Sequence, residues 1–291
     1  MIKNTPILRT MLAIAMLPVM IIACKKDVSV TGITLSQNTA SLIIDETLTL
    51  TATVLPENAS NKDVTWWSTN TAVATVANGE IIAKDFGLTN IIVTTRDGNK
   101  TDTCVVTVGL GTVSFATDSI WTVGSQTWSD AVQTSGCSNR TTFYGGDWLT
   151  LSNFNVDCRS NPGQKGDLFS WQAVYELKDE LCPSPWRVPT TEDFRDLDIA
   201  LGGTGNSTNN NPTHRDRYLN DWGGTYGGES TAVGTLNHQG SIGFYWSQSE
   251  VSDDSHNAYL LFFGRDTFLS VAPAIYYGKF IGFSLRCVRD N

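Results

Sequence analysis

Residues 30–108 consist of short runs in which apolar and polar side chains alternate, and this pattern restricts the region to a β fold. Within Thr47–Val54 every second residue is leucine, alanine or valine, and the others are threonine. A strand here would therefore have one buried and one wet face. Asn78-Gly79 and Asp97-Gly98 each lie between two such runs, and both residue pairs suit the tight turn of a hairpin. Short strands with frequent turns over about 80 residues predict a β-sandwich.

Several features of this region carry a family resemblance. The string Val64–Ser68 (VTWWS) and the run Ala72–Val76 are followed by Gly79 and Gly87. Together they resemble the group 2 bacterial immunoglobulin-like domain, and the resemblance covers nearly all of residues 30–108. It implies an all-β immunoglobulin-like sandwich that serves as a spacer or adhesion module and has no catalytic residues.

A basic and then apolar leader precedes this region. Lys3 and Arg9 come before an apolar stretch from Met11 to Ala23, which is too short to span a bilayer core of about 30 Å. Ala23-Cys24, at the end of the stretch, resembles the lipobox of bacterial lipoproteins. An ordinary signal peptide and a weak transmembrane anchor are the alternatives.

The lipobox resemblance implies cleavage before Cys24 and a lipid on its thiol. Residues 1–23 are then a lipoprotein signal peptide, and residues 24–29 form a short tether. We therefore expect the protein to be held in the outer membrane by the lipid on Cys24 and to be exposed at the cell surface.

Charge and motif content exclude several classes of function. Residues 1–23 hold two of the 20 basic residues and no acidic one, so the remainder carries 18 basic and 29 acidic residues, a net charge of −11. This sign argues against nucleic acid as a partner. His214, His238 and His256 lie far apart without metal-ligand spacing, and no motif for a nucleophile or a phosphate loop occurs. We predict neither an enzyme nor a site for a metal or cofactor.

The second half of the chain is expected to mix helices and strands. Gly109–Thr112 is the expected linker, and a second domain is expected over residues 113–291. Thr191 can cap a helix over residues 192–201. Residues 202–240 are rich in glycine, asparagine and threonine, which predicts a long loop. Strands are expected near residues 244–247, 258–263 and 283–288.

Separated blocks in this half carry a second resemblance. Leu181–Thr190, Tyr245–Ser247 and Gly282–Arg289 resemble the Fibrobacter succinogenes major paralogous domain, a family with the C-type lectin-like fold. The resemblance implies an α+β domain over residues 113–291, whose two ends meet and whose long loop region carries the binding surface. No Glu-Pro-Asn, Gln-Pro-Asp or Trp-Asn-Asp tripeptide occurs, so calcium-dependent sugar binding is not expected.

Five cysteines follow Cys24, and disulfides can form outside the cytoplasm. An odd number leaves one thiol unpaired. We assign it to Cys104, because a free cysteine in a strand behaves as a small buried apolar residue. In the lectin-like domain we predict the pairs Cys182–Cys287 and Cys137–Cys158. Four cysteines allow three pairings, so the other two remain open.

Ala258–Phe263 is apolar on both faces of its expected strand. One interpretation is a strand buried on both sides; the other is that one face belongs to a binding surface. The tyrosines that follow resemble an antibody paratope in composition, and Val251–Phe280 resembles the variable region of lectin-like proteins diversified by retroelements. The predicted ligand-binding residues are Asp254, His256, Tyr259, Leu261, Phe263, Arg265, Phe268, Tyr276 and Tyr277. The hypothesis fails if Tyr259 and Phe263 are fully buried within the domain.

These patterns predict a lipid-anchored adhesion or recognition protein whose C-terminal domain binds an unknown extracellular protein or glycan. Binding would bury aromatic anchors inside a polar rim. A structural or assembly subunit of a fimbrial or glycan-uptake complex is the first alternative. An enzyme related to formylglycine-generating proteins is the second, and it would require reactive cysteines or a metal.

Overall fold

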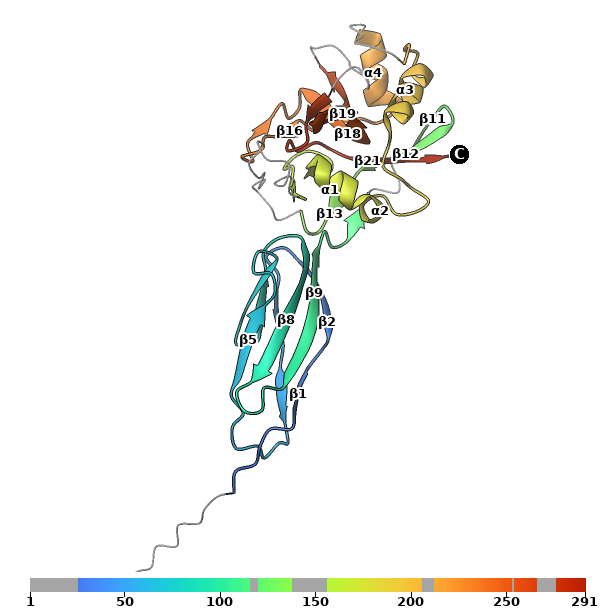
Figure 1. Cartoon of the computed structure of the whole chain (residues 1–291). Helices are drawn as coiled ribbons and strands as arrows, with labels where there is room; N and C mark the ends of the chain where they lie inside the picture. Colours follow the sequence, from blue (N-terminus) through green and yellow to red (C-terminus); the bar gives the residue numbers. More distant parts are fainter. Residues whose placement is uncertain (1–25, 116–119, 138–155, 206–211, 253, 266–275) are drawn as a thin grey trace, which may run out of the picture.

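The computed structural model describes residues 26–115, 120–137, 156–205, 212–252, 254–265 and 276–291. The chain forms two parts that follow one another in sequence and in space. An N-terminal part made of strands ends where β9 leads into the C-terminal part, which carries all the described helices (Figure 1).

The N-terminal part is a β-sandwich, as the alternating pattern predicts. One sheet has the order β2-β9-β8-β5, with β2 parallel to β9. A second has the order β3-β7-β6, and β1 pairs with β4. The strands are β1 (Gly32–Leu35), β2 (Thr39–Ile43), β3 (Thr47–Thr49), β4 (Ala52–Leu55), β5 (Val64–Ser68), β6 (Ala74–Ala77), β7 (Glu80–Ala83), β8 (Gly87–Thr95) and β9 (Thr101–Gly109).

The predicted strand Thr47–Val54 is divided between two sheets. β3 pairs with β7, whereas β4 pairs with β1. Between them, the N–H of the buried Leu50 donates to the carbonyl of Gly79 at 2.8 Å, and the N–H of Thr51 donates to Ser36 Oγ at 3.1 Å. Because these hydrogen bonds lead to different sheets, the chain changes sheet here while its alternation of buried and exposed residues continues.

The two turn predictions differ in accuracy. Asn78 and Gly79 join β6 to β7 with φ angles of 53° and 88°, which confirms the first hairpin. In the turn from β8 to β9 the positive φ angles fall on Gly98 (75°) and Asn99 (46°), one residue later than the predicted pair. The hairpin exists, but its turn has a different register.

Cys104 is unpaired and fully buried in the sandwich core beside Ile91 and Val106, as predicted. Burial, and secondly the charge of Asp102, raises the pKa of the Cys104 thiol. The side chain therefore stays a neutral apolar group of the core.

The C-terminal part combines short helices with two three-stranded sheets, β11-β12-β21 and β18-β19-β20. Its helices are α1 (Trp171–Glu176), α2 (Lys178–Leu181), α3 (Thr191–Ala200) and α4 (Pro212–Asn220). Its strands are β10 (Val113–Ser114), β11 (Trp121–Val123), β12 (Gln126–Ala131), β13 (Gln133–Thr134), β14 (Cys158–Arg159), β15 (Leu168–Phe169), β16 (Glu229–Ser230), β17 (Leu236–Asn237), β18 (Ile242–Val251), β19 (Asp254–Gly264), β20 (Tyr276–Gly278) and β21 (Arg286–Asp290).

The two ends of this part meet in one sheet. β12, near its start, pairs antiparallel with β21 at its end, with Trp128 opposite Val288. Both predicted disulfides, Cys137–Cys158 and Cys182–Cys287, are formed. The second of them fastens the end of α2 to β21, so the helical segment is covalently joined to the sheet that closes the domain.

The helix prediction was right for α3 and wrong for α4. α3 is capped by Thr190, one residue before the predicted cap, and Asp193 completes a reciprocal capping box. α4 falls inside the segment predicted to be loop. Its aliphatic content is low, and it is held by Tyr218, which is buried in a cluster with Trp222 and Phe263.

β19 is buried on both faces over Leu260–Phe263, which confirms the first of the two interpretations of this run. Leu260 and Phe262 pack in a cluster that contains α1, while Leu261 and Phe263 pack in a cluster that contains α3 and α4. Leu261 and Phe263 are fully buried, so their prediction as ligand-contact residues is wrong. The helices α3 and α4 cover the face that was assigned to a ligand.

Candidate binding surface on β19 and β20

The exposed end of β19 carries a pair of tyrosines. β19 and β20 are antiparallel, and Tyr259 stands directly opposite Tyr276. The two rings lie edge to face with centroids 6.4 Å apart. Tyr259 is half-buried, and Tyr276 is 52% exposed. Because Tyr259 is not fully buried, this part of the predicted binding surface is available to a ligand.

Polar groups lie at the start of β19 beside this pair. Asp254 Oδ1 accepts the backbone N–H of His256 at 2.9 Å, and its Oδ2 accepts a hydrogen bond from the side chain of Asn257. The bond from the His256 N–H, followed by that from Asn257, lowers the pKa of the Asp254 carboxyl. Asp254 and His256 are both substantially exposed. We define Asp254, Asn257, Tyr259 and Tyr276 as the tyrosine patch.

Tyr277 belongs to a different face from Tyr276, because successive residues of a strand point to opposite sides. Its ring packs edge-on against Phe244 and Phe283, at centroid distances of 6.2 and 5.8 Å. Burial, and then the charge of Glu229, raises the pKa of the Tyr277 hydroxyl. Tyr277 is still 37% exposed, so it can contribute to a neighbouring contact area.

Glu229 and His238 lie beside Tyr277 and were not among the predicted site residues. His238 Nδ1 is 3.3 Å from Glu229 Oε1, and the pairing of β16 with β17 brings them together, since Glu229 is opposite Asn237. The sequence analysis had considered His238 only as one of three histidines that lack metal-ligand spacing. The sequence around Glu229 does not predict that this residue lies near Tyr277 of β20, because the two are brought together only by the tertiary fold.

Arg265 lies apart from the tyrosine patch. It follows β19 at the end opposite to Asp254, donates from its guanidinium to the carbonyl of Gly240 and lies 5.7 Å from the ring centroid of Tyr226. Phe268 lies outside the described residues. The structure therefore places Tyr259 opposite Tyr276, places Asp254 and His256 close to each other at the start of β19, places Tyr277 on the other face of β20, and separates Arg265 from them.

A buried lysine fixes the patch to α1. Lys279 follows β20, and its N–H donates to the carbonyl of His256 at 2.9 Å. Its ammonium lies 4.2 Å from the ring centroid of Trp171 and forms an ion pair with Glu250. The N–H of Trp171 donates to the carbonyl of Lys279 at 3.0 Å. The backbone next to the patch is thus held by both β19 and α1.

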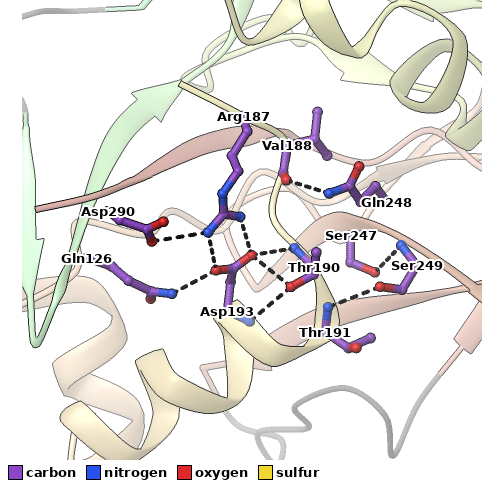
Figure 2. A network of polar contacts seen from close by, with 10 residues as sticks. All are labelled: Gln126, Arg187, Val188, Thr190, Thr191, Asp193, Ser247, Gln248, Ser249 and Asp290. Carbon is purple, nitrogen blue, oxygen red and sulfur yellow. Dashed lines mark hydrogen bonds and ion pairs between the residues drawn. The ribbon is translucent and has the colours of Figure 1, made fainter. Parts of the chain in front are cut away.

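A polar network lies behind the patch (Figure 2). Arg187 binds Asp193 with two hydrogen bonds of 2.5 and 2.8 Å and also contacts Asp290 of β21. Burial opposes ionisation of Asp193, but the hydrogen bonds from Arg187 and Thr190 outweigh it, so the pKa of Asp193 lies below its usual value. The hydrogen bonds that Arg187 donates to Asp193 also raise the pKa of Arg187 above its usual value.

This network continues to the backbone of the tyrosine patch. The N–H of Thr191 donates to Ser249 Oγ at 3.2 Å, and the N–H of Ser249 donates to Ser247 Oγ at 3.2 Å (Figure 2). Ser247 Oγ in turn donates to the carbonyl of Tyr259 at 2.8 Å. The pairing of β18 with β19 shifts register between Trp246 and Glu250, so the serines lie in an irregular stretch. Such bulges re-aim side chains next to functional sites.

One cluster of titratable side chains, formed by Asp198, His214 and Tyr218, lies in the C-terminal core. No group of three or more His, Cys, Asp or Glu side chains in the described ranges could hold a metal ion. Asp198 accepts hydrogen bonds from Tyr218 at 2.7 Å and lies 2.8 Å from His214 Nε2, but all three side chains are buried in the core. The arrangement that remains accessible is an aromatic pair with a polar rim, which suits non-covalent binding.

The predicted lipid anchor cannot be compared with the structure. Cys24 and residues 1–23 lie outside the described residues. Among the residues that are described, no helix is long and apolar enough to cross a membrane.

A comparison with protein families identifies the sandwich. The profile of the group 2 bacterial Ig-like domain matches residues 29–106. This part of the chain is a bacterial Ig-like domain. The match begins and ends within two residues of the range predicted from the sequence, 30–108, and its strands are β1 to β9.

The relatives found among curated proteins share this Ig-like domain. The chain is 51% identical over 83 residues to the "Ig-like virion protein" of Serratia phage KSP90, a match that covers 28% of this chain and 32% of that protein. It is 40% identical over 68 residues to the "Minor capsid protein" of Enterobacteria phage T3, covering 23% and 16% of the two chains. The chain thus spans a third or less of the length of either relative.

Among solved structures, domains 5–6 of the S-layer protein SbsC are 15% identical and cover 47% of this chain and 81% of that one, with a TM-score of 0.24. A TM-score of this size carries no argument about the fold. The Ig-like domain is therefore identified by its sequence profile and by its strands.

Proposed function

We propose that the chain is a lipid-anchored surface protein in which the Ig-like domain acts as a stalk and the C-terminal part is a C-type lectin-like recognition domain. Its ligand is an extracellular protein or glycan bound at the tyrosine patch. The observation that carries this proposal is the exposed edge-to-face pair of Tyr259 and Tyr276 beside the polar groups of Asp254 and Asn257. Rigid aromatic side chains with a polar rim are typical of binding hot spots.

The lectin-like assignment of residues 113–291 is supported by two features. The ends of the domain pair in one sheet, β12 with β21, and the Cys182–Cys287 disulfide joins the first motif block to the last strand. Residues just after the blocks Leu181–Thr190 and Tyr245–Ser247, which carry the resemblance, also contact one another, because the N–H of Thr191 donates to Ser249 Oγ.

The proposed anchor has a direct test. Cells that express the chain are expected to incorporate labelled palmitate into it, and the Cys24→Ala variant is expected to lose all of the label while the Cys104→Ala variant keeps it. Equal labelling of wild type and Cys24→Ala would remove the lipoprotein part of the proposal but leave the binding surface untouched.

The binding role predicts a large effect for one exposed tyrosine. The full chain would be screened on a glycan array and in pull-downs of envelope proteins, which separates the two ligand classes. For whichever ligand is found, Tyr276→Ala is expected to weaken binding by at least about tenfold, the effect of removing an interface hot spot. The affinity would be measured by titration calorimetry.

Tyr175→Ala is the matched control. Tyr175 is 47% exposed, close to the 52% of Tyr276, but it lies on α1 and stacks on Trp171. We expect its loss to leave the affinity within about twofold of wild type. Equal losses for both variants, or none for Tyr276→Ala, would show that the ligand binds elsewhere.

A structural or assembly subunit is the second candidate. It is favoured by the names of the relatives that share the Ig-like domain, a virion protein and a minor capsid protein. A partner that is recovered in pull-downs, and whose binding does not depend on Tyr276, would support this candidate. The same names agree with the expectation that the chain is not an enzyme.

An enzyme of the formylglycine-generating kind has less support. The four cysteines of the C-terminal part form disulfides, and Cys104 is buried in the Ig-like domain. Among the described residues, no exposed thiol is left for such chemistry.

A further inference from the structure

The residues that join the two domains are fixed in place. Leu110, Gly111 and Thr112 separate β9 from β10. Leu110 is 1% exposed and packs in a hydrophobic cluster of the C-terminal domain. Its carbonyl accepts the N–H of Gly136 at 2.8 Å, and the N–H of Thr112 donates to Ser135 Oγ at 2.9 Å. The predicted linker is thus anchored to the C-terminal domain by the buried Leu110 and by these hydrogen bonds, although Gly111 and Thr112 themselves are exposed.

Gly111 marks a close approach of the two domains. It has a φ angle of 70°, which favours glycine. A Cβ atom added there would lie 2.2 Å from Ser135 Oγ and 2.6 Å from Cγ2 of Ile43. Ser135 belongs to the C-terminal domain, whereas Ile43 ends β2 of the Ig-like domain. The backbone of Gly111 therefore lies between side chains of both domains with no room for a larger residue.

Phe86 makes a second contact between the domains. It lies between β7 and β8, and it packs both against the core of the Ig-like domain and against the cluster of the C-terminal domain that contains Leu110. Next to it, Gly87 and Val108 of the Ig-like domain face Leu177 and Glu180 of the C-terminal domain across a cavity of about 200 Å³. Residues of both domains thus line the space between Phe86 and the end of α1.

We propose that Leu110, Gly111 and Phe86 lock the Ig-like domain and the C-terminal domain into one rigid unit. The face of the C-terminal domain around Leu177 is then an interaction surface whose partner is the chain's own Ig-like domain. Contacts at Gly111 and at Phe86 restrict rotation about more than one axis, and the satisfied hydrogen bonds of the linker restrict bending. Domains joined by an exposed flexible linker would instead reorient freely.

A rigid joint would fix the orientation of the C-terminal domain relative to the Ig-like domain. It holds the C-terminal domain at one angle on the stalk, so every copy presents the tyrosine patch in the same direction relative to the Ig-like domain. This inference does not depend on what the patch binds, because the joint is formed by residues outside it.

The test measures the distance between the domains in the full chain. Nitroxide labels carried by a ketone amino acid replace Trp67 and Ile199, which are 49% and 55% exposed and lie in different domains. This chemistry leaves the cysteines unlabelled. Pulsed electron paramagnetic resonance is expected to give one narrow distance distribution for the wild-type joint and a distribution at least about twofold broader for Gly111→Ala.

Gly109→Ala is the matched control, because a Cβ atom at Gly109 meets nothing within 4 Å. We expect it to keep the narrow distribution. Phe86→Ala tests the second contact and should also broaden the distribution. If Gly111→Ala does not fold, the Phe86→Ala variant and the width for the wild-type joint still decide the question. A broad distribution for the wild-type joint, or unchanged widths for both variants, would overturn the proposal.

Discussion

Removing the Cys182–Cys287 disulfide is expected to lower the free energy of unfolding of the C-terminal domain by about 4.7 kcal/mol. The bond joins residues separated by 105 positions, and closing a loop of that length removes much conformational entropy from the unfolded chain. The double variant Cys182→Ser/Cys287→Ser would be compared with wild type by urea unfolding. Fluorescence reports mainly on this domain, because seven of the nine tryptophans lie in it and only Trp66 and Trp67 lie in the Ig-like domain.

Two control variants distinguish the effect of losing a cross-link on stability from the effect of replacing a cysteine side chain. Cys137→Ser/Cys158→Ser opens a separation of only 21 residues, for which the same relation gives a loss of about 3 kcal/mol. Cys104→Ala removes a buried thiol but no cross-link, and we expect no change in the fluorescence transition of the C-terminal domain. A loss for the Cys182/Cys287 variant no greater than that of the Cys137/Cys158 variant would contradict the chain-entropy account.

The sequence predicted the Ig-like domain well because its information is local. The alternation in Thr47–Val54 and the Asn78-Gly79 turn each specify a strand or a hairpin without reference to the rest of the chain. What the alternation could not reveal was the change of sheet at Leu50, because the hydrogen bonds of Leu50 and Thr51 go to residues brought near by folding.

The error at Leu261 and Phe263 has one physical origin. A strand that is apolar on both faces can be buried twice or can present one face to a ligand, and its own residues do not distinguish the two cases. The helix that covers Phe263 is α4, whose sequence PTHRDRYLN is polar and follows a stretch of glycine and asparagine. Because α4 was predicted to be loop, the prediction lacked the helix whose Tyr218 packs against Phe263.

The sequence likewise predicts only part of the candidate binding site. Tyr259 and Tyr276 could be predicted as aromatic surface, since they lie in a tyrosine-rich segment. The division of Tyr276 and Tyr277 between two faces requires the register of β20 against β19, and the arrival of Glu229 beside Tyr277 requires the fold. The hydrogen bond from Thr191 to Ser249, which leads to the backbone of Tyr259, joins residues about 60 positions apart that follow two of the motif blocks.

Arg286 marks another place where a motif residue acquires a role only in the fold. The pairing of β12 with β21 shifts register between Trp128 and Ala131, so the carbonyl of Ser129 is left without a strand partner. Arg286 Nε donates to that carbonyl at 2.5 Å, and its Nη1 donates to the carbonyl of Trp222 at 2.6 Å. Its guanidinium lies 4.3 Å from the Trp222 ring centroid. One buried cation thus closes the bulge and holds the loop after α4.

Replacing this cation is the second change with a large expected effect. Burial lowers the pKa of Arg286 to about 10, so the side chain is still charged at neutral pH. Arg286→Met keeps most of the volume but removes the donors to two buried carbonyls, each of which costs about 1–3 kcal/mol when left unsatisfied. We expect the free energy of unfolding to fall by about 3 kcal/mol at pH 7. Arg286→Lys should recover only part of it, because one ammonium cannot reproduce the planar fork.

The control lies on the same strand. Arg289 of β21 also stacks on a tryptophan, 4.7 Å from the ring centroid of Trp186, but it is partly exposed. Arg289→Met is expected to cost less than about 1 kcal/mol. Urea unfolding of the variants at one pH gives the comparison. Replacing a buried charge with an apolar side chain can be neutral when the surrounding groups find new partners. An Arg286→Met protein as stable as wild type would therefore show that the bulge at Ser129 closes without the guanidinium.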